Sequence, residues 1–111
     1  MREIKYIVVH CTAGPKDQTT QAIKDFWKKN LGWKNPGYHL IVNADGTYER
    51  LADDSVVCNG VANYNSNAIH ISYKGGADAK GKGLDTRTEA QKKTLLTLVK
   101  TMKAKYPKAI S

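Results

Sequence analysis

The amino-acid sequence predicts an α/β fold in which a mixed central β-sheet is flanked by helices. Short apolar runs at 6–9, 38–42 and 68–73 are rich in β-branched and aromatic residues, which is the composition of strands. Two longer segments, near 20–31 and 88–106, repeat apolar residues three or four positions apart, as on one face of a helix. The predicted order is strand, helix, strand pair, strand and helix, within 111 residues, a length that suits a single domain.

The first predicted strand ends in residues that suit a functional site. Residues 6–9 (YIVV) form a continuous apolar run, as expected for a strand that is buried on both faces of a sheet. His10 follows, and a strand end is a good place for chemistry because the strand fixes the side chain while the next loop admits substrate. His10 is therefore a candidate acid/base group or metal ligand; the alternative is a packed strand-end histidine. Cys11 is not expected to be a nucleophile with His10 as its base, since adjacent strand residues point to opposite faces.

The next segment is predicted to be a helix followed by a β-hairpin. Thr19 or Thr20 can cap the helix, and Gly32 is expected to end it. Two strands, at 38–42 and 47–51, surround a tight turn. The apolar residues of the helix, with one more packing just beyond its end, are Ile23, Phe26, Trp27, Leu31 and Trp33.

The second half of the chain is predicted to contain one strand and one long helix. Polar residues 53–67 are expected to form a long surface loop, followed by the strand at 68–73 and a flexible connection at 77–85. Residues 88–91 (TEAQ) have the form of a capping box, which begins a helix that Pro107 ends. The apolar stripe of this helix consists of Leu95, Leu98, Val99, Met102 and Tyr106.

The last residues, 109–111 (AIS), look like the start of another strand. The sequence stops there, so the sheet is predicted to be truncated before its last strand, and the single domain, 1–111, to be incomplete at its C-terminal end. An open sheet edge of this kind favours pairing with another chain. We therefore expect low stability or a homodimer through the exposed sheet edge.

The net charge of +8 is concentrated near the end of the chain, where residues 92–111 contain six lysines and no acidic residue. Such a surface favours anionic partners, but it lacks the regular interleaving of aromatic residues that a base-stacking surface needs. The alternative is a solubilising lysine face, and we do not expect a nucleic-acid partner. No apolar run approaches the length of about 18 residues that a membrane span needs, and no signal peptide is visible. We expect a protein that is cytoplasmic as synthesised, with Cys11 and Cys58 as reduced thiols.

Three histidines and one tyrosine are candidates for a site. A hydrolytic zinc site needs three protein ligands and an open position for water. His10 is the best ligand by position, whereas His39 fits a buried histidine that orients a neighbour. His70 alternates with two isoleucines, so it is expected to face away from them and toward the side of His10. Tyr38 follows a turn, where its phenol can donate to a developing oxyanion, although it also fits an ordinary strand aromatic.

Four segments, taken together and in order, resemble zinc-dependent N-acetylmuramoyl-L-alanine amidases of the phage lysozyme type, which share their fold with animal peptidoglycan-recognition proteins. The segments are IVVHCTAG, GWKNPGYHLIVNADGTYERL, NYNSNAIHISYKGG and TRTEAQKKTLLTLVKTMKAKYP. The resemblance implies a peptidoglycan hydrolase in which zinc-bound water cleaves the amide between the lactyl group of N-acetylmuramic acid and L-alanine. It places His10 at a zinc-ligand position, Tyr38 at that of a catalytic tyrosine, and His39 at that of a histidine that does not bind metal. Peptidoglycan or muropeptides would be the substrate, and the cell wall the site of action of a phage or prophage lysin.

The chain departs from the family pattern at its end, because the other zinc ligands and a second catalytic side chain of the family lie beyond Ser111. On that pattern the chain keeps His10 as one of three zinc ligands. An alternative function is therefore a catalytically inactive short form that binds peptidoglycan fragments or a protein partner. A further hypothesis is a substitute metal site built from His10 and His70 with Cys58, motivated by a histidine at position 70 where the family has a small or polar residue.

Overall fold

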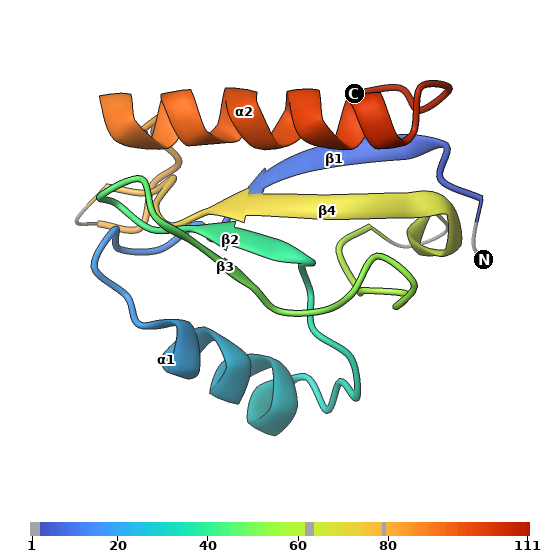
Figure 1. Cartoon of the computed structure of the whole chain (residues 1–111). Coiled ribbons are helices and arrows are strands. Elements are labelled where there is room, and N and C mark those ends of the chain that lie inside the picture. Colours follow the sequence, from blue (N-terminus) through green and yellow to red (C-terminus); the bar gives the residue numbers. More distant parts are fainter. Residues whose placement is uncertain (1–2, 62–63, 79) are drawn as a thin grey trace.

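The computed structural model describes residues 3–61, 64–78 and 80–111, and Figure 1 shows a β-sheet between two helical layers. No helix within these ranges combines the length and the apolar character that crossing a lipid bilayer requires. In chain order the elements are β1 (Tyr6–Cys11), α1 (Thr20–Asp25), the π-helical turn η1 (Phe26–Asn30), β2 (Leu40–Val42), β3 (Tyr48–Arg50), the 3₁₀ turn η2 (Asn65–Asn67), β4 (Ala68–Tyr73) and α2 (Glu89–Lys105).

The sheet is mixed, as predicted, with the strand order β1-β4-β2-β3. Strand β4 pairs in parallel with both β1 and β2, whereas β2 pairs antiparallel with β3. Helix α2 runs along one face of the sheet, and α1 lies on the opposite side, in the connection from β1 to β2 (Figure 1). This arrangement confirms the predicted α/β fold with helices on both sides of a mixed sheet.

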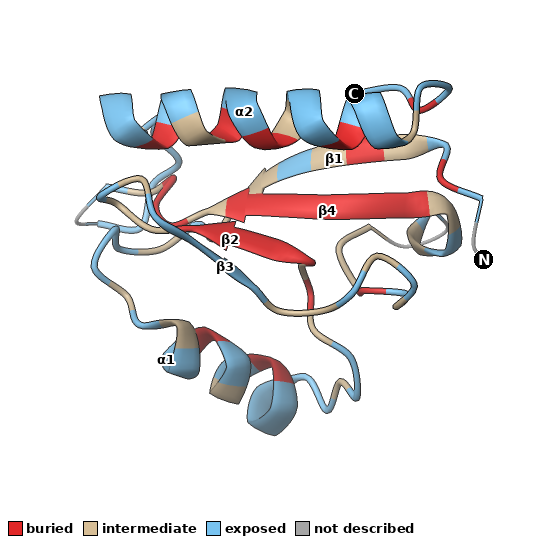
Figure 2. Ribbon diagram, viewed as in Figure 1, coloured by how far each residue is buried: buried red, intermediate tan, exposed pale blue. Residues whose placement is uncertain are grey.

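The larger apolar core lies between the sheet and α2. The helix contributes the predicted residues Leu95, Leu98 and Met102, while Val99 and Tyr106 are only partly buried against the same core. In Figure 2 the buried residues of α2 lie on the side that faces the sheet. The sheet and the flanking segments contribute Ile4, Ile7, Leu40, Val42, Ile69, Ile71 and Ala109.

Strand β4, rather than β1, is the most buried strand. The first five residues of β4 are all buried, and Figure 2 shows this burial along the strand. In β1 only Ile7 is buried, and Val9 is 46% exposed. The prediction that the strand at 6–9 is buried on both faces is therefore wrong. The reason is its position: β1 has β4 on one side, but on its other side the described residues form only an isolated parallel bridge between Tyr6 and Ile110.

That bridge agrees with the strand-like character predicted for residues 109–111. The backbone N–H of Ile7 donates to the Ile110 carbonyl over 2.8 Å, and the N–H of Ile110 donates to the Lys5 carbonyl over 2.9 Å. Residue 110 therefore lies beside β1, at the edge of the four-stranded sheet.

The hairpin strands are shorter than predicted. The second one begins at Tyr48 because the Asp45 carboxylate accepts hydrogen bonds from the Thr47 backbone N–H and hydroxyl, at 2.9 and 2.6 Å, so Thr47 belongs to the turn. The first begins at Leu40 instead of residue 38, while β1 continues to Cys11. Residues 62–63 of the predicted loop and residue 79 of the predicted connection lie outside the described part of the chain.

The first helix begins and ends as predicted but changes geometry along its length. The Thr19 hydroxyl accepts the Ala22 backbone N–H over 3.1 Å, which caps α1. After Asp25 the helix widens into η1, where the N–H of Leu31 donates to the Phe26 carbonyl. Gly32 has a φ of 66°, a conformation that ends the helix at little steric cost.

The capping box of α2 also ties this helix to the sheet. Thr88 and Gln91 exchange their hydrogen bonds as the sequence predicts, at 2.9 and 3.0 Å. Gln91 is fully buried, and its side-chain amide donates to the Lys74 carbonyl just beyond β4, over 2.9 Å. The cap therefore fixes the start of α2 against the end of β4.

A charged cluster fixes the other end of α2. The Asp54 carboxylate accepts hydrogen bonds from Lys105 at 2.7 Å, Tyr106 at 2.9 Å and Arg50 at 2.9 Å, and its side chain is only 11% exposed. Burial by itself raises the pKa of Asp54, but the three donors outweigh it and lower the pKa to about 2. The ionised carboxylate thus links the loop after β3 to the last turn of α2.

We expect Asp54→Asn to lower the free energy of unfolding at neutral pH by about 1 to 2 kcal/mol, because the folded state binds the ionised form more strongly than the unfolded state does. Since the folded pKa lies below the ordinary value of 3.8, this stabilisation is present above pH 3.8 and is lost as the pH falls toward 2. Urea unfolding at several pH values measures it, with the exposed neighbour Asp53→Asn as control. Equal stability of both variants at neutral pH would contradict the role assigned to Asp54.

Candidate functional site

The parallel pairing of β1 with β4 brings His10 and His70 together. The register aligns Val8 with His70 and His10 with Ser72, so the side chains of these residues share the face of the sheet that α1 covers. The His10 Nε2 and His70 Nδ1 atoms are 2.8 Å apart, within hydrogen-bond distance. The prediction that His70 faces the side of His10 is therefore confirmed. Burial lowers the pKa of His10 below its ordinary value, which favours the neutral imidazole.

His39 lies against His70, and the two rings stack with their centroids 5.9 Å apart. It is fully buried, its Nδ1 atom accepts the His70 backbone N–H over 3.0 Å, and its Nε2 atom lies 2.7 Å from the Val56 carbonyl. Both ring nitrogens of His39 are therefore engaged with backbone groups. This arrangement joins the start of β2 to β4 and to the loop after β3.

Tyr38 forms the other side of the site. Its ring centroid lies 5.3 Å from that of His10 and 5.3 Å from that of Trp27, and its hydroxyl donates to the Cys11 carbonyl over 3.3 Å. Burial raises the pKa of Tyr38, and this effect exceeds the opposite influence of the Ser72 hydroxyl. The phenol is therefore a stable proton donor at neutral pH, located beside the end of β1.

An aromatic cleft opens next to Tyr38, with a volume of about 230 Å³. We interpret Phe26 and Leu31 as residues of this cleft, since they are 49% and 45% exposed although the sequence predicts them on the apolar face of a helix. Phe26 belongs to the widened turn η1, and Leu31 directly follows it. The full lining comprises Thr12, Gln18, Ile23, Phe26, Trp27, Leu31, Trp33 and Tyr38.

Cys11 follows His10 on β1, so the two side chains point to opposite faces of the sheet. The Cys11 side chain packs against Gly76, where an added Cβ would lie only 2.5 Å from its sulfur atom. Cys58 is fully buried. Within residues 3–61, 64–78 and 80–111, no group of three His, Cys, Asp or Glu side chains could hold a metal ion. The described donors therefore include His10 as a candidate ligand but do not fit a complete zinc site, nor the substitute site of His10, His70 and Cys58.

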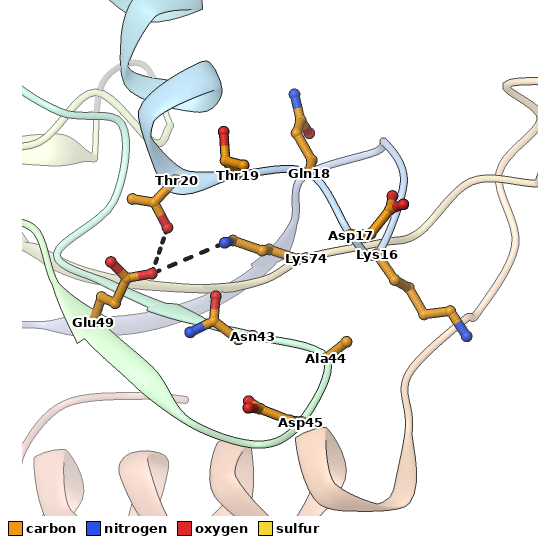
Figure 3. A pocket seen from close by; sticks show the side chains of 10 residues that line it. All are labelled: Lys16, Asp17, Gln18, Thr19, Thr20, Asn43, Ala44, Asp45, Glu49 and Lys74. Atoms are coloured by element: carbon orange, nitrogen blue, oxygen red, sulfur yellow. Dashed lines mark hydrogen bonds and ion pairs between the residues drawn. The ribbon is translucent and has the colours of Figure 1, made fainter.

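A second cavity, of about 490 Å³, lies between the start of α1 and the β2–β3 hairpin (Figure 3). Lys74, only 6% exposed, points toward Glu49 with 3.9 Å between their charged atoms, and the Thr20 hydroxyl also donates to this carboxylate. We interpret the contacts as a structural link between α1, β3 and the end of β4, because Glu49 already neutralises the buried ammonium group. The sequence contained no pattern that singled out this pair.

Comparisons with known proteins agree with the fold. The sequence profile of a family described as N-acetylmuramoyl-L-alanine amidase matches residues 1–111. The endolysin of Escherichia phage T7 is 38% identical over 106 residues, which cover 94% of this chain and 70% of that protein. The solved Ph2119 endolysin from a Thermus scotoductus bacteriophage superposes with a TM-score of 0.84 at 32% identity, over 99% of this chain and 70% of its own. Drosophila PGRP-LB shares the fold, with a TM-score of 0.75 at 16% identity over 95% of this chain and 64% of its own.

We expect Tyr38→Phe to remove one phenol that ionises above pH 10.0, the ordinary value for tyrosine, because burial disfavours the charged phenolate. Ultraviolet titration measures this as a difference between wild type and variant that develops only above that pH. The exposed Tyr48→Phe is the matched control for the loss of one phenol. If the difference in absorbance between wild type and Tyr38→Phe were complete below pH 10.0, the partly buried environment assigned to Tyr38 would be contradicted.

Proposed function

Because this chain belongs to the N-acetylmuramoyl-L-alanine amidase family, we propose that it hydrolyses the amide between the lactyl group of N-acetylmuramic acid and L-alanine in peptidoglycan. The observation that carries the proposal is the convergence of His10 and Tyr38 at the end of β1, beside an aromatic cleft. A partly buried phenol, a neutral imidazole and an apolar surface at the end of a strand are a suitable combination for cleaving a sugar-linked peptide.

The aromatic cleft is proposed to bind the muropeptide next to the scissile amide. Trp33 and Phe26 offer flat apolar surfaces on which a sugar ring or a peptide backbone can pack, and the buried Trp27 stacks on Trp33. Tyr38 belongs to the same lining and faces His10, so a substrate in the cleft would present its amide to both side chains. Binding would also exclude water from the phenol, which strengthens its hydrogen bonds.

Tyr38 is proposed to be a catalytic residue that donates a hydrogen bond to the amide oxygen as negative charge develops on it. Its hydroxyl now donates to the Cys11 carbonyl over a long 3.3 Å, a contact that a substrate oxygen can replace. The raised pKa of Tyr38 keeps the proton on the phenol during this exchange. Because the donor is already in place, little reorganisation accompanies the reaction.

His10 is proposed to be a zinc ligand, since members of this family are generally zinc-dependent. The described residues supply this one imidazole but not a complete set of three ligands, so no step of the reaction is derived through the metal here. The same observation favours a second candidate function, in which the chain binds peptidoglycan fragments or a protein partner without cleaving them.

Wider expectations about the domain, the site of action and the partners belong to this proposal. We propose that residues 1–111 act as one amidase domain and that the cell wall is the site of action, as for a phage or prophage lysin made in the cytoplasm. The relatives named endolysin support this place of action. A homodimer through the outer edge of β1 remains a prediction, as does the absence of a nucleic-acid partner.

The test is digestion of purified peptidoglycan with the 111-residue chain. Amide cleavage releases new L-alanine amino termini without new reducing sugar ends, whereas a glycosidase would release reducing ends. We expect Tyr38→Phe to lower the rate about 100-fold, the loss typical when one donor to a developing oxyanion is removed. Tyr48→Phe, on the exposed face of β3, is the control and should keep full activity. Binding to peptidoglycan without any new amino termini would instead support the non-catalytic alternative.

Metal analysis gives an independent prediction. We expect the purified chain to retain well below one zinc ion per chain after dialysis, because a single imidazole competes weakly with water and buffer. Titration with zinc followed by atomic absorption measures this, with His10→Ala as the control that removes the residual binding. One zinc per chain, lost in His10→Ala, would contradict the prediction and would mean that other residues of the chain or a second copy of it complete the ligand set.

A further inference from the structure

We propose that His70 is a positioning residue for His10: a hydrogen-bond chain from Asn65 through His70 fixes His10 in the tautomer with hydrogen on Nε2. The inference rests on the proposed function, because His10 matters to the reaction only if the site at the end of β1 is the active site. It assigns to position 70 a role that differs from metal ligation.

The series of hydrogen bonds begins at the side-chain oxygen of Asn65, which can only accept. The side-chain oxygen Oδ1 of Asn65 accepts the Val61 backbone N–H over 2.7 Å, which identifies this atom as the oxygen and not the nitrogen of the amide. The His70 Nε2 atom lies 2.9 Å from the same oxygen. Since an amide oxygen can only accept, His70 must carry hydrogen on Nε2.

This acceptor determines which ring nitrogens of His70 and His10 carry hydrogen. A neutral imidazole with hydrogen on Nε2 has a lone pair on Nδ1, so His70 Nδ1 can only accept. The His10 Nε2 atom, 2.8 Å away, must therefore be the donor. The lone pair of His10 is thus on Nδ1, which makes no hydrogen bond within the described residues and is available to a ligand.

The surroundings of His70 prevent its ring from leaving this arrangement. The ring is fully buried and stacks on that of His39, with centroids 5.9 Å apart and an angle of 13° between the planes. On another side lies Gly60, where an added Cβ would be only 2.3 Å from His70 Nδ1. Any residue larger than glycine at position 60 would collide with the imidazole, so Gly60 and His70 depend on each other.

The same contacts exclude His70 as a ligand in this conformation. Its Nε2 atom binds Asn65 and its Nδ1 atom binds His10, so both ring nitrogens are occupied. A histidine that hydrogen-bonds the far nitrogen of another histidine sets the orientation and tautomer of that ring, as partners of metal-binding or catalytic histidines do.

The direct test is long-range proton–nitrogen NMR of the chain with ¹⁵N-labelled histidine, recorded above the ordinary histidine pKa of about 6.5. We expect His10 and His70 each to show one protonated Nε2 and one unprotonated Nδ1, with no averaging between tautomers. Averaged shifts for His10, or hydrogen on its Nδ1, would overturn the proposal. This wild-type measurement needs neither a variant nor activity.

Two variants at position 70 separate positioning from packing. His70→Phe keeps a flat ring but removes the acceptor, so we expect averaged tautomers for His10. His70→Asn can place an amide oxygen near the position of Nδ1, so it should restore the single tautomer in part. If the chain is an amidase, the rate should fall about 10- to 100-fold in His70→Phe and less in His70→Asn. An unchanged His10 spectrum in a folded His70→Phe variant would refute the role of His70.

The two proposals can fail separately. A fixed His10 tautomer in a chain that never cleaves peptidoglycan leaves the positioning role intact and rejects the amidase activity. Full amidase activity with a freely averaging His10 tautomer rejects the positioning role alone.

Discussion

The site depends on the parallel pairing between β1 and β4. This pairing sets His10 beside Ser72 and places His70 one step earlier on the same face, which is what allows the two imidazoles to touch. A shift of one residue in the register would direct His70 into the apolar core under α2 and an isoleucine toward His10. The buried strand β4 pairs with both β1 and β2, so it fixes the positions of His10 at the end of β1 and of Tyr38 before β2.

The two faces of the sheet differ in polarity. Beneath α2 the contacts are almost entirely apolar, and their burial provides most of the stability of a domain of this size. Beneath α1 the sheet carries His39 and His70, which are fully buried, and whose ring nitrogens are engaged with backbone or side-chain partners. Burying a polar group costs free energy unless the group is hydrogen-bonded. The hydrogen bonds of His39 and His70 offset this cost, and the same bonds hold the two rings in place.

The sequence predicted the parts of this arrangement that depend on local pattern. Alternation along 68–73 correctly turned His70 toward the side of His10, and the capping box of α2 is present as predicted. The sequence could not reveal that β1 is partly exposed, because an apolar run does not show how many neighbours cover it. It also could not reveal Asn65 or Gly60 as partners of His70, since their loop is shaped by side-chain hydrogen bonds and close packing, which leave no periodic signal.

The link between Gly60 and His70 shows how such a site can tolerate an unusual residue. A histidine on a central strand occupies volume on the face that α1 covers, and here that volume is available because position 60 has no side chain. The added ring nitrogens need partners, which Asn65 and His10 provide at 2.9 and 2.8 Å. Without this space and these partners, a buried histidine at position 70 would destabilise the fold. With them, His70 hydrogen-bonds His10 and holds its ring in place.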